Sequence, residues 1–483
     1  MWLRVGALVT LAFCALVTTR GHAQENNDLD RIPKALQSSP PESTPEQSNA
    51  PSLPAPRAHG KYYAEDALTL SSAGDGLAVP LPTPAPSDWE NRTSLDAADQ
   101  WTVTRGLTAT LSDRFNVTEE NAVDVPSQHL IRNDFREGYV TWEPLTRTYL
   151  EAGRVNLRDG IALGFNPTDF FKTRTLLDQA SLDPSVVRED RLGTLMLRGQ
   201  SIWSGGSVSV AFAPKLCAPT PITLGVPYGL GAKFDHTNAA NRILGSVNFE
   251  TAGLSPQVLL YHEGSETLIG MNLSRSIGQS VVAYAEWAGG NQPSLIAQSA
   301  AYGVRTGTLP ADTPLLPPAD AADAFRSDLA LGASWSSASK VTFNIEYHYH
   351  QAGLSRQEER DWFTIGTAQR NLLPVIGELW YIRAFANDQQ QPWVQQQLFL
   401  RVDWADAMIP HLELAAFAFV NLYDGSSLSQ LSANYYLSDA WSLGAYASAN
   451  VGGYASANVG GARSERGSYP QVASLIIQVL RYF

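Results

Sequence analysis

Segments of about ten residues, in which apolar and polar side chains alternate, recur from Trp101 to the end of the chain. In residues 341–350, the odd-numbered positions are apolar or aromatic and the even-numbered positions are polar. Successive side chains of a strand point to opposite faces, so each segment predicts a strand with one apolar and one polar face. Strands of soluble sandwiches alternate in the same way, and a second observation is needed to choose between the two.

The lengths of the connections supply that observation. The predicted strands are 101–111, 132–143, 147–155, 192–203, 206–214, 242–250, 255–263, 267–276, 279–288, 325–336, 339–350, 392–404, 411–420, 427–437, 439–449 and 472–483. Tight turns alternate with long stretches at 156–191, 215–241, 289–324, 351–391 and 450–471. Transmembrane barrels use short turns at one rim and longer loops at the other. The sequence therefore predicts an all-β fold, a transmembrane antiparallel up-and-down β-barrel.

The strand count depends on residues 351–391. Without further strands there, the barrel has sixteen strands, and with strands at 362–367 and 376–385 it has eighteen. Both are even numbers, as single-chain bacterial barrels prefer. A connection of this length without secondary structure is unusual, so we favour eighteen strands and keep sixteen as the alternative.

The N-terminal residues have the composition of an export signal. Arg4 precedes an apolar run from Val5 to Val17, and Gly21-His22-Ala23 forms a small-x-small cleavage site, so we expect residues 1–23 to be removed. A lipoprotein signal ending at Cys14 is the alternative, which the bulky residue before it disfavours. Beyond this signal no stretch of about 18 apolar residues predicts a transmembrane helix.

Residues 24–88 are rich in proline, serine and acidic residues. This composition is typical of linkers that do not bury a core, and we expect a mostly disordered periplasmic segment. The barrel is then expected to occupy 89–483. Docking of a periplasmic partner on 24–88 is the alternative role.

Charge and cysteine content exclude several classes of function. The formal net charge of −13 argues against nucleic acid as a partner, because phosphate binding needs a basic surface. With Cys14 removed, Cys217 is the remaining cysteine, which excludes an intramolecular disulfide and a thiolate metal site. We expect no cofactor. The octapeptide at 446–453 recurs unchanged at 454–461, which we interpret as a duplication tolerated at a loop tip.

The last strand ends in Arg481-Tyr482-Phe483, after apolar residues at alternate positions. A terminal aromatic on an alternating last strand resembles the assembly signal of Gram-negative outer-membrane β-barrel proteins, although Arg481 departs from that pattern. The resemblance implies a location in the bacterial outer membrane, with outer-membrane lipid and the barrel-assembly machinery as partners. The N-terminal segment is then expected in the periplasm.

A second pattern begins at the end of the predicted strand 147–155. Gly153-Arg154, then Gly160, then Asn166-Pro167-x-Asp169 resembles a pattern of porin-like barrels. The resemblance implies a channel-type barrel with an inserted loop, and it brings no substrate. Long loops of this kind fold back to narrow a pore, and the candidate constriction residues of loop 156–191 are Asn166, Pro167, Asp169, Phe170, Phe171 and Arg174. An ordinary surface loop is the alternative.

Alternation also places ionisable side chains on the inner face. The candidate pore-lining residues are Glu151, Arg198, Arg242, Glu286, Arg326, Asp328, Glu346, His348, Arg401 and Asp403. A channel selects by the charges and width that it presents to solute. Alternatively, these mixed charges form cross-strand ladders that stabilise any barrel, so selectivity by net charge is not predicted.

His348 and His350 face the same side of one strand, as two metal ligands would. Besides Glu346, the sequence places no carboxylate next to them, and we expect no metal. No Gly-x-Ser-x-Gly motif occurs, and we expect no enzyme.

Barrels of sixteen to eighteen strands leave an aqueous lumen, whereas barrels of eight strands do not. We therefore expect an outer-membrane channel for small solutes, made selective by the inward-folded loop 156–191. An exporter of a polymer or hydrophobic metabolite, working with a periplasmic partner, is the alternative, followed by an outer-membrane enzyme or adhesin.

Overall fold

The computed structural model describes residues 60–74, 77–82, 87–121, 128–222, 230–251, 253–453 and 462–483. The expected signal peptide, residues 24–59 of the expected linker and the second octapeptide lie outside these ranges. The described residues form one sheet of eighteen strands. The strands are β1 (Lys61–Ala73), β2 (Trp89–Thr104), β3 (Leu107–Asn121), β4 (Gln128–Leu145), β5 (Thr148–Val155), β6 (Thr194–Trp203), β7 (Gly206–Ala213), β8 (Arg242–Phe249), β9 (Gln257–Glu263), β10 (Glu266–Ile277), β11 (Val281–Gln292), β12 (Ala324–Ser336), β13 (Val341–His350), β14 (Gln396–Trp404), β15 (Leu412–Asn421), β16 (Ser427–Ser438), β17 (Trp441–Val451) and β18 (Gln471–Tyr482).

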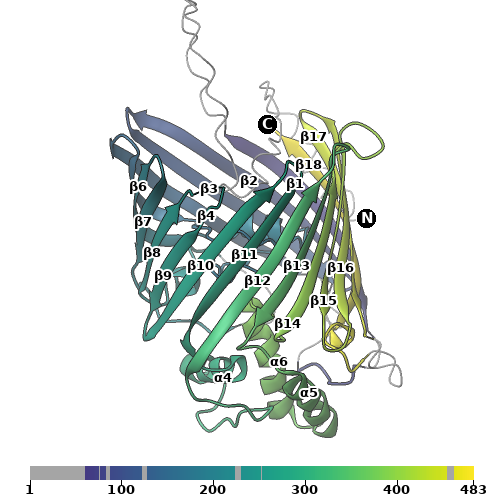
Figure 1. Cartoon of the computed structure of the whole chain (residues 1–483). Coiled ribbons are helices and arrows are strands. Elements are labelled where there is room, and N and C mark those ends of the chain that lie inside the picture. Colours follow the sequence, from purple (N-terminus) through teal and green to yellow (C-terminus); the bar gives the residue numbers. More distant parts are fainter. Residues whose placement is uncertain are drawn as a thin grey trace, which may run out of the picture.

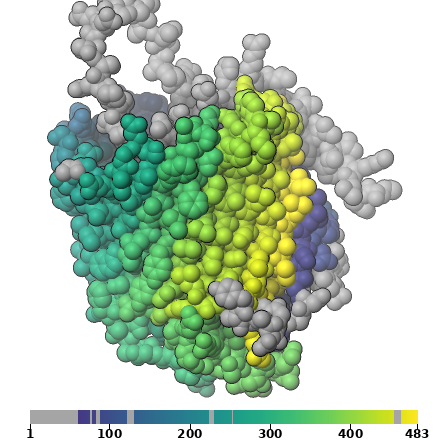
Figure 2. Space-filling model, turned by 45° about the vertical axis from the view of Figure 1, so that its right-hand side comes forward, coloured from purple at the N-terminus to yellow at the C-terminus, as the bar shows by residue number. Residues whose placement is uncertain are grey.

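The sheet closes on itself. Each strand pairs antiparallel with the next in sequence, and β1 pairs with β18 as well as with β2. Tyr63 lies opposite Tyr482 and Leu70 opposite Leu475 at this seam. The last strand lies beside the first in Figure 2, yellow against purple, and the tilted strands surround a common axis in Figure 1. The prediction of an eighteen-stranded up-and-down barrel is confirmed.

The strands that complete the count are not those expected from the sequence. Residues 362–367 and 376–385 are helical, within α5 (Arg356–Ala368) and α6 (Leu373–Asp388). Ser355 and Glu358 form a capping box at the start of α5, and Pro374 stands in the first turn of α6. These start signals, and not the short apolar runs that follow them, decide the local structure.

The missing strands come from the N-terminal side instead. The expected strand 101–111 straddles a turn, because Gly106 adopts a left-handed φ of 78° and its carbonyl accepts from Glu143 N. Thus β2 and β3 replace one predicted strand, and β1 lies inside the segment expected to be a linker. The barrel therefore begins at Lys61 and not at residue 89.

The wall is apolar outside and polar inside. On β13, Phe343 is 37% exposed and Ile345 is 40% exposed, whereas Asn344 and Glu346 between and beside them are buried. The same inversion recurs around the barrel, with Leu260, Met271, Leu331 and other large apolar side chains exposed. Among the described residues, no helix has the length and apolar character needed to cross a membrane.

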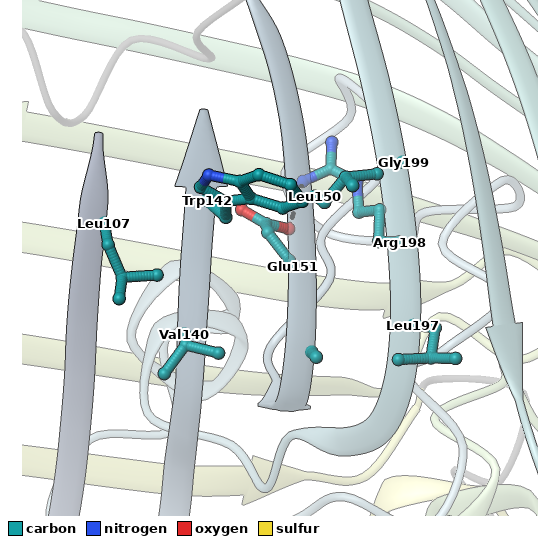
Figure 3. Close-up of a pocket in the computed structure, with 9 residues that line it drawn as sticks. Leu107, Val140, Trp142, Leu150, Glu151, Leu197, Arg198 and Gly199 are labelled. Carbon is teal, nitrogen blue, oxygen red and sulfur yellow. Dashed lines mark hydrogen bonds and ion pairs between the residues drawn. The ribbon is translucent and has the colours of Figure 1, made fainter. Parts of the chain in front are cut away.

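A shallow hollow on the outer wall of β3–β6 belongs to this apolar surface. Its lining includes Leu107, Val140, Trp142, Leu150 and Leu197 (Figure 3). Neighbouring positions on β5 and β6 hold Glu151 and Arg198, whose side chains form an ion pair with a 2.9 Å N–O distance. Since neighbours alternate in direction, this ion pair lies on the inner side of the wall and the hollow on the outer side.

Helices cover the rim that carries the long connections (Figure 1). We call α4 (Leu295–Thr306), α5 and α6 the helical cap; shorter helices are α2 (Pro184–Glu189), α3 (Phe234–Thr237) and the 3-10 turn η4 (Arg466–Ser468). Trp362, Leu379 and Phe385 belong to the buried apolar core of the cap. The β1–β2 connection joins this core through Val79, and Trp380 Nε1 donates to Pro80 O at 2.8 Å.

Candidate lumen constriction

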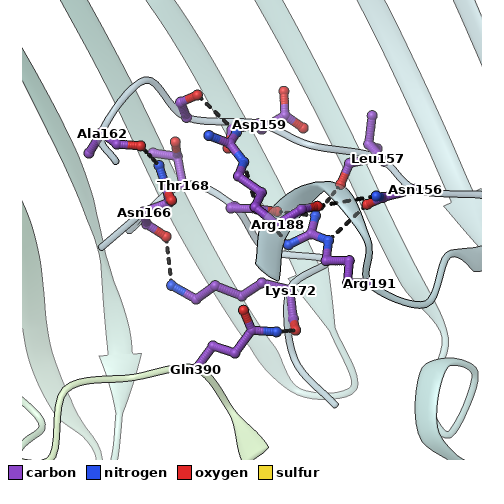
Figure 4. Close-up of polar contacts among 12 residues, drawn as sticks. Asn156, Leu157, Asp159, Ala162, Asn166, Thr168, Lys172, Arg188, Arg191 and Gln390 are labelled. Atoms are coloured by element: carbon purple, nitrogen blue, oxygen red, sulfur yellow. Dashed lines mark hydrogen bonds and ion pairs between the residues drawn. The ribbon is translucent and has the colours of Figure 1, made fainter. Parts of the chain in front are cut away.

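Residues 156–191, nearly all of the connection between β5 and β6, lie inside the barrel, and we call them the inserted loop. Its two ends are held together, because Arg191 Nε donates to Asn156 Oδ1 at 2.8 Å and Arg191 NH2 donates to Leu157 O at 2.7 Å. Arg191 also binds both carboxylate oxygens of Asp169, at 2.8 and 2.9 Å. Figure 4 shows this arginine and Arg188 reaching the first residues of the loop. The inserted loop therefore leaves and rejoins the wall at one place.

Glu286, on the inner face of β11, is the first anchor of the inserted loop. It is fully buried, and its carboxylate accepts from the backbone N–H groups of Ile161, Ala162 and Thr168 at 2.7–3.0 Å. The Thr168 hydroxyl donates a further bond at 2.8 Å. Such charge-assisted bonds are about twice as strong as neutral ones, so this carboxylate fixes the path of the loop.

Glu346, on the inner face of β13, is the second anchor. Its oxygens accept from Leu163 N at 2.6 Å and from Gly164 N at 2.8 Å. Tyr284 OH and His348 Nε2 complete its shell at 2.6 and 2.8 Å. A Cβ at Gly164 would lie 2.6 Å from the Phe399 ring, so the close approach of loop and wall requires glycine there.

The second half of the inserted loop contacts other parts of the wall. Asp178 binds Arg92 on β2 at 3.0 Å, and Asp183 binds Arg401 on β14 at 2.8 Å. Asp190 binds Arg136 on β4 at 3.1 Å. Strands β2 and β4 lie well away in strand order from β11 and β13, which hold the first half. The loop thus crosses the lumen and is tied to the wall on both sides.

The six candidate constriction residues all belong to this crossing. Phe170 stacks on Tyr261 with ring centroids 4.6 Å apart, and Arg242 lies over Phe171 at 5.8 Å. The Asn166 amide donates to Ala162 O, and Asn166 O accepts from Lys172 Nζ at 2.6 Å (Figure 4). Pro167 is buried beside them, Asp169 pairs with Arg191, and Arg174 reaches Asp388 of the helical cap.

Most of the candidate pore-lining residues lie around the inner wall in pairs of a basic residue or histidine with a carboxylate. The pairs are Glu151 with Arg198, Arg242 with Glu263, Asp328 with His350, Arg401 with Asp403, and Glu346 with His348, whereas Glu286 binds the inserted loop alone. Arg326 binds Gln292 O. The two histidines thus bind different carboxylates, and the described residues contain no group of three or more His, Cys, Asp or Glu arranged to hold a metal ion.

A cluster of arginines on β2–β4 was missed in the sequence. Arg92, Arg114, Arg132 and Arg136 are buried on the inner face, where they bind Glu65, Asp96 and Asp134 at 2.6–2.8 Å. The predicted strand 101–111 includes neither Arg92 of β2 nor Arg114 of β3, so the faces of these two arginines do not follow from it. Arg132 and Arg136 lie in the predicted strand 132–143, but they are not among the candidate pore-lining residues. The signal was nevertheless present, because Arg92, Ser94 and Asp96 are polar at alternate positions next to apolar Leu95.

The closed barrel, its apolar outer wall and its polar interior define the architecture of a transmembrane β-barrel, with the inserted loop tied to the inner wall. No family model and no curated protein sequence matches the chain. Among solved structures, the chain is similar to OccK5 (OpdH) of Pseudomonas aeruginosa, with 10% identity, a TM-score of 0.48, and coverage of 88% of this chain and 98% of that chain.

Two further similar structures have the same coverage of this chain. OccK11 (OpdR) of Pseudomonas aeruginosa has 9% identity and a TM-score of 0.47, with 96% of its chain covered. OmpF of Salmonella typhi, in complex with daunomycin, has 8% identity and a TM-score of 0.39, with 97% covered. At these identities and TM-scores, the fold assignment rests on the strand pairing of the chain itself.

Proposed function

We propose that the chain is an outer-membrane channel for small solutes, whose lumen is narrowed by the inserted loop. The observation that carries this proposal is the loop itself, anchored to Glu286 and Glu346 on one side and to Arg92 and Arg136 on the other. Barrels of this strand number enclose an aqueous lumen, and a loop fixed across that lumen sets its width.

The apolar outer wall supports the membrane location. Side chains such as Leu260 and Ile345 face outward on a closed barrel in which the strands pair without an edge. By analogy with barrels whose short turns face the periplasm, the rim with Lys61 and Phe483 is the periplasmic rim. The segment before Lys61 then extends into the periplasm, and the helical cap faces outward.

The last strand supports a role in assembly. Phe483 N donates to Tyr62 O at 3.0 Å, so the terminal residue lies at the seam between β18 and β1. We propose that barrel-assembly machinery recognises this strand and that outer-membrane lipid surrounds the wall.

Single-channel recording in planar bilayers tests the channel function. The wild-type chain is compared with a variant in which residues 159–189 are replaced by a short Gly-Ser linker, which the neighbouring ends at Asn156 and Arg191 permit. We expect discrete currents for the wild type and a larger conductance for the loop-replaced variant, because the loop crosses the lumen.

A deletion of the duplicated octapeptide 454–461, in a different outer connection, is the matched control and should leave the conductance unchanged. Folded barrels that pass no current in either form would contradict the channel function. An equal conductance in wild type and the loop-replaced variant would contradict the constriction.

A further inference from the structure

One side chain of the inserted loop reaches out of the lumen to the helical cap. Arg174 N donates to Asp388 O at 2.8 Å, and Arg174 Nε lies 3.3 Å from Asp388 Oδ2. From the end of α6, the Gln390 amide donates to Lys172 O and, at 2.9 Å, to Thr175 Oγ1. We call this contact, of residues 172–175 with Asp388 and Gln390, the loop–cap junction.

The same guanidinium also binds the β7–β8 connection. Arg174 NH1 donates to Asp235 O at 3.0 Å, and NH2 donates to the carbonyl and hydroxyl oxygens of Thr220 at 3.2 and 3.1 Å. The ring of Tyr302 from α4 lies 5.4 Å from the guanidinium carbon, and its hydroxyl donates to Thr220 O at 2.9 Å. Arg174, only 5% exposed, therefore joins the inserted loop to the β7–β8 connection, α4 and α6.

The backbone of the junction is held in a strained conformation. Arg174 has φ = 60° and Gln390 has φ = 52°, both in the left-handed region that non-glycine residues rarely adopt. Such strain persists only where surrounding contacts impose it. Arg174 contacts Asp388, and Gln390 contacts Lys172 and Thr175, so the mutual contacts of the loop and the cap determine the path of both.

The junction also lies at a mechanically important point of the inserted loop. Residues 161–168 are bound to β11 and β13, whereas Asp178 is bound to β2. Residues 172–175 lie between these two attachments and are held by the cap and by the β7–β8 connection. Thr175 O also accepts from Leu192 N, at the far end of the β5–β6 connection, at 2.9 Å. Loss of the junction would leave the middle of the crossing without that support.

We propose, resting on the channel function above, that Arg174 is a positioning residue that fixes the constriction to the outer connections. The width of the lumen is then set partly at the outer mouth, by the helical cap and the β7–β8 connection. A change in the position of the cap moves the middle of the inserted loop.

The test compares Arg174→Ala with Arg305→Ala. Arg305 lies over the same Tyr302 ring at 4.9 Å, but it is exposed at the end of α4, which makes it a matched control. We expect Arg174→Ala to conduct at a level between wild type and the loop-replaced variant, with added open-channel noise. Arg305→Ala should match wild type, and Arg174→Lys should be intermediate, because an ammonium retains the charge for Asp388 without the guanidinium fork.

Hydrogen–deuterium exchange provides a readout that does not depend on current. The amides of residues 172–175 should exchange faster in Arg174→Ala than in wild type, while those of residues 161–168 should change little. If Arg174→Ala fails to assemble, Gln390→Ala removes the other side-chain ties to Lys172 and Thr175 and should give the same pattern.

Failure of this inference differs from failure of the channel function. Wild-type exchange, conductance and noise in assembled Arg174→Ala or Gln390→Ala would overturn the role of the junction in a chain that still conducts. Faster exchange in a chain that passes no current would overturn the channel function, and with it the effect on lumen width, while the junction itself would stand.

Discussion

Asp178 of the inserted loop covers two arginines of the inner wall. Its side chain is 31% exposed, whereas those of Arg92 and Arg132 are 4% and 2% exposed. Solutes in the lumen therefore meet the Asp178 carboxylate before they meet the two guanidinium groups. The acidic and basic charges of this cluster nearly cancel, because Glu65 and Asp134 also bind these arginines. The order of exposure, and not the charge count alone, determines what this part of the lumen presents.

Replacement of Asp178 by asparagine should shift the ion preference toward anions. The change preserves the shape and leaves Arg92 and Arg132 without their lumen-side counter-charge. One unit charge about 8 Å away in water changes the energy of a cation and of an anion by about 0.5 kcal/mol in opposite directions, so the cation-to-anion permeability ratio should fall up to about sixfold, and less in high salt. The reversal potential in a potassium chloride gradient measures this ratio.

Asp406→Asn is the control for that prediction. It makes the same charge change in the exposed β14–β15 turn, where Asp406 pairs with Lys340. A reversal potential that shifts equally in both variants, or in neither, would contradict a role for Asp178 in the lumen.

The sequence predicted the two carboxylates and the loop of the candidate site, but not the contacts between them. Alternation on β11 and β13 placed Glu286 and Glu346 on the inner face, and the length and charge of 156–191 marked the loop that they bind. The loop partners of both carboxylates are mainly backbone N–H groups, which every residue except proline carries and which residue identity does not reveal. The loop path was therefore beyond what residue identities specify.

At the scale of elements, the sequence predicts the strands in which apolar and polar residues alternate regularly. It fails where the alternation is short or where helix start signals compete with it. Strands β4–β18 follow from alternation and short turns. In contrast, β1 has only a short apolar set within polar, proline-flanked sequence, and its pairing with both β2 and β18 supplies the stability that local pattern does not show. In α5 and α6, short apolar runs resemble strands, and only the helix start signals indicate the helices that form.

The contact between α5 and the barrel rim should make stability depend on pH. Glu359 is buried, and burial together with the carboxylates of Asp424 and Glu465 raises its pKa to about 8, although Asn421 donates to it at 2.8 Å. Its ordinary value in the unfolded chain is 4.5. The native state thus favours the neutral form, and stability is full below pH 4.5 and is lost as pH rises through 8.

We therefore expect the wild type to unfold at a lower temperature at pH 9 than at pH 5. Its free energy of unfolding should be lower at pH 9, by on the order of a few kcal/mol. In Glu359→Gln, which still accepts from Asn421, this pH dependence should be weaker. Heat modifiability on gels, measured across pH, tests the prediction. Parallel pH profiles for the two chains would contradict it, and Glu358→Gln on the same helix controls for loss of a carboxylate.

At the scale of the whole molecule, the barrel depends on β1. A chain that begins at Gly60 after its signal peptide should assemble, because it contains all eighteen strands. A chain that begins at Ser87 lacks β1, which leaves β2 and β18 with unpaired edges that lipid does not satisfy. Protease resistance in membranes distinguishes the two, and assembly of the shorter chain would contradict the boundary at Lys61.

The seam between Tyr63 and Tyr482 also has a consequence in time. The two partners are separated by almost the whole chain, so the first strand to be exported waits for the last one before it has its second neighbour. Contacts of such long sequence separation form slowly. Until Phe483 arrives, the leading strand keeps an open edge, and its protection from aggregation in the interval must come from other molecules.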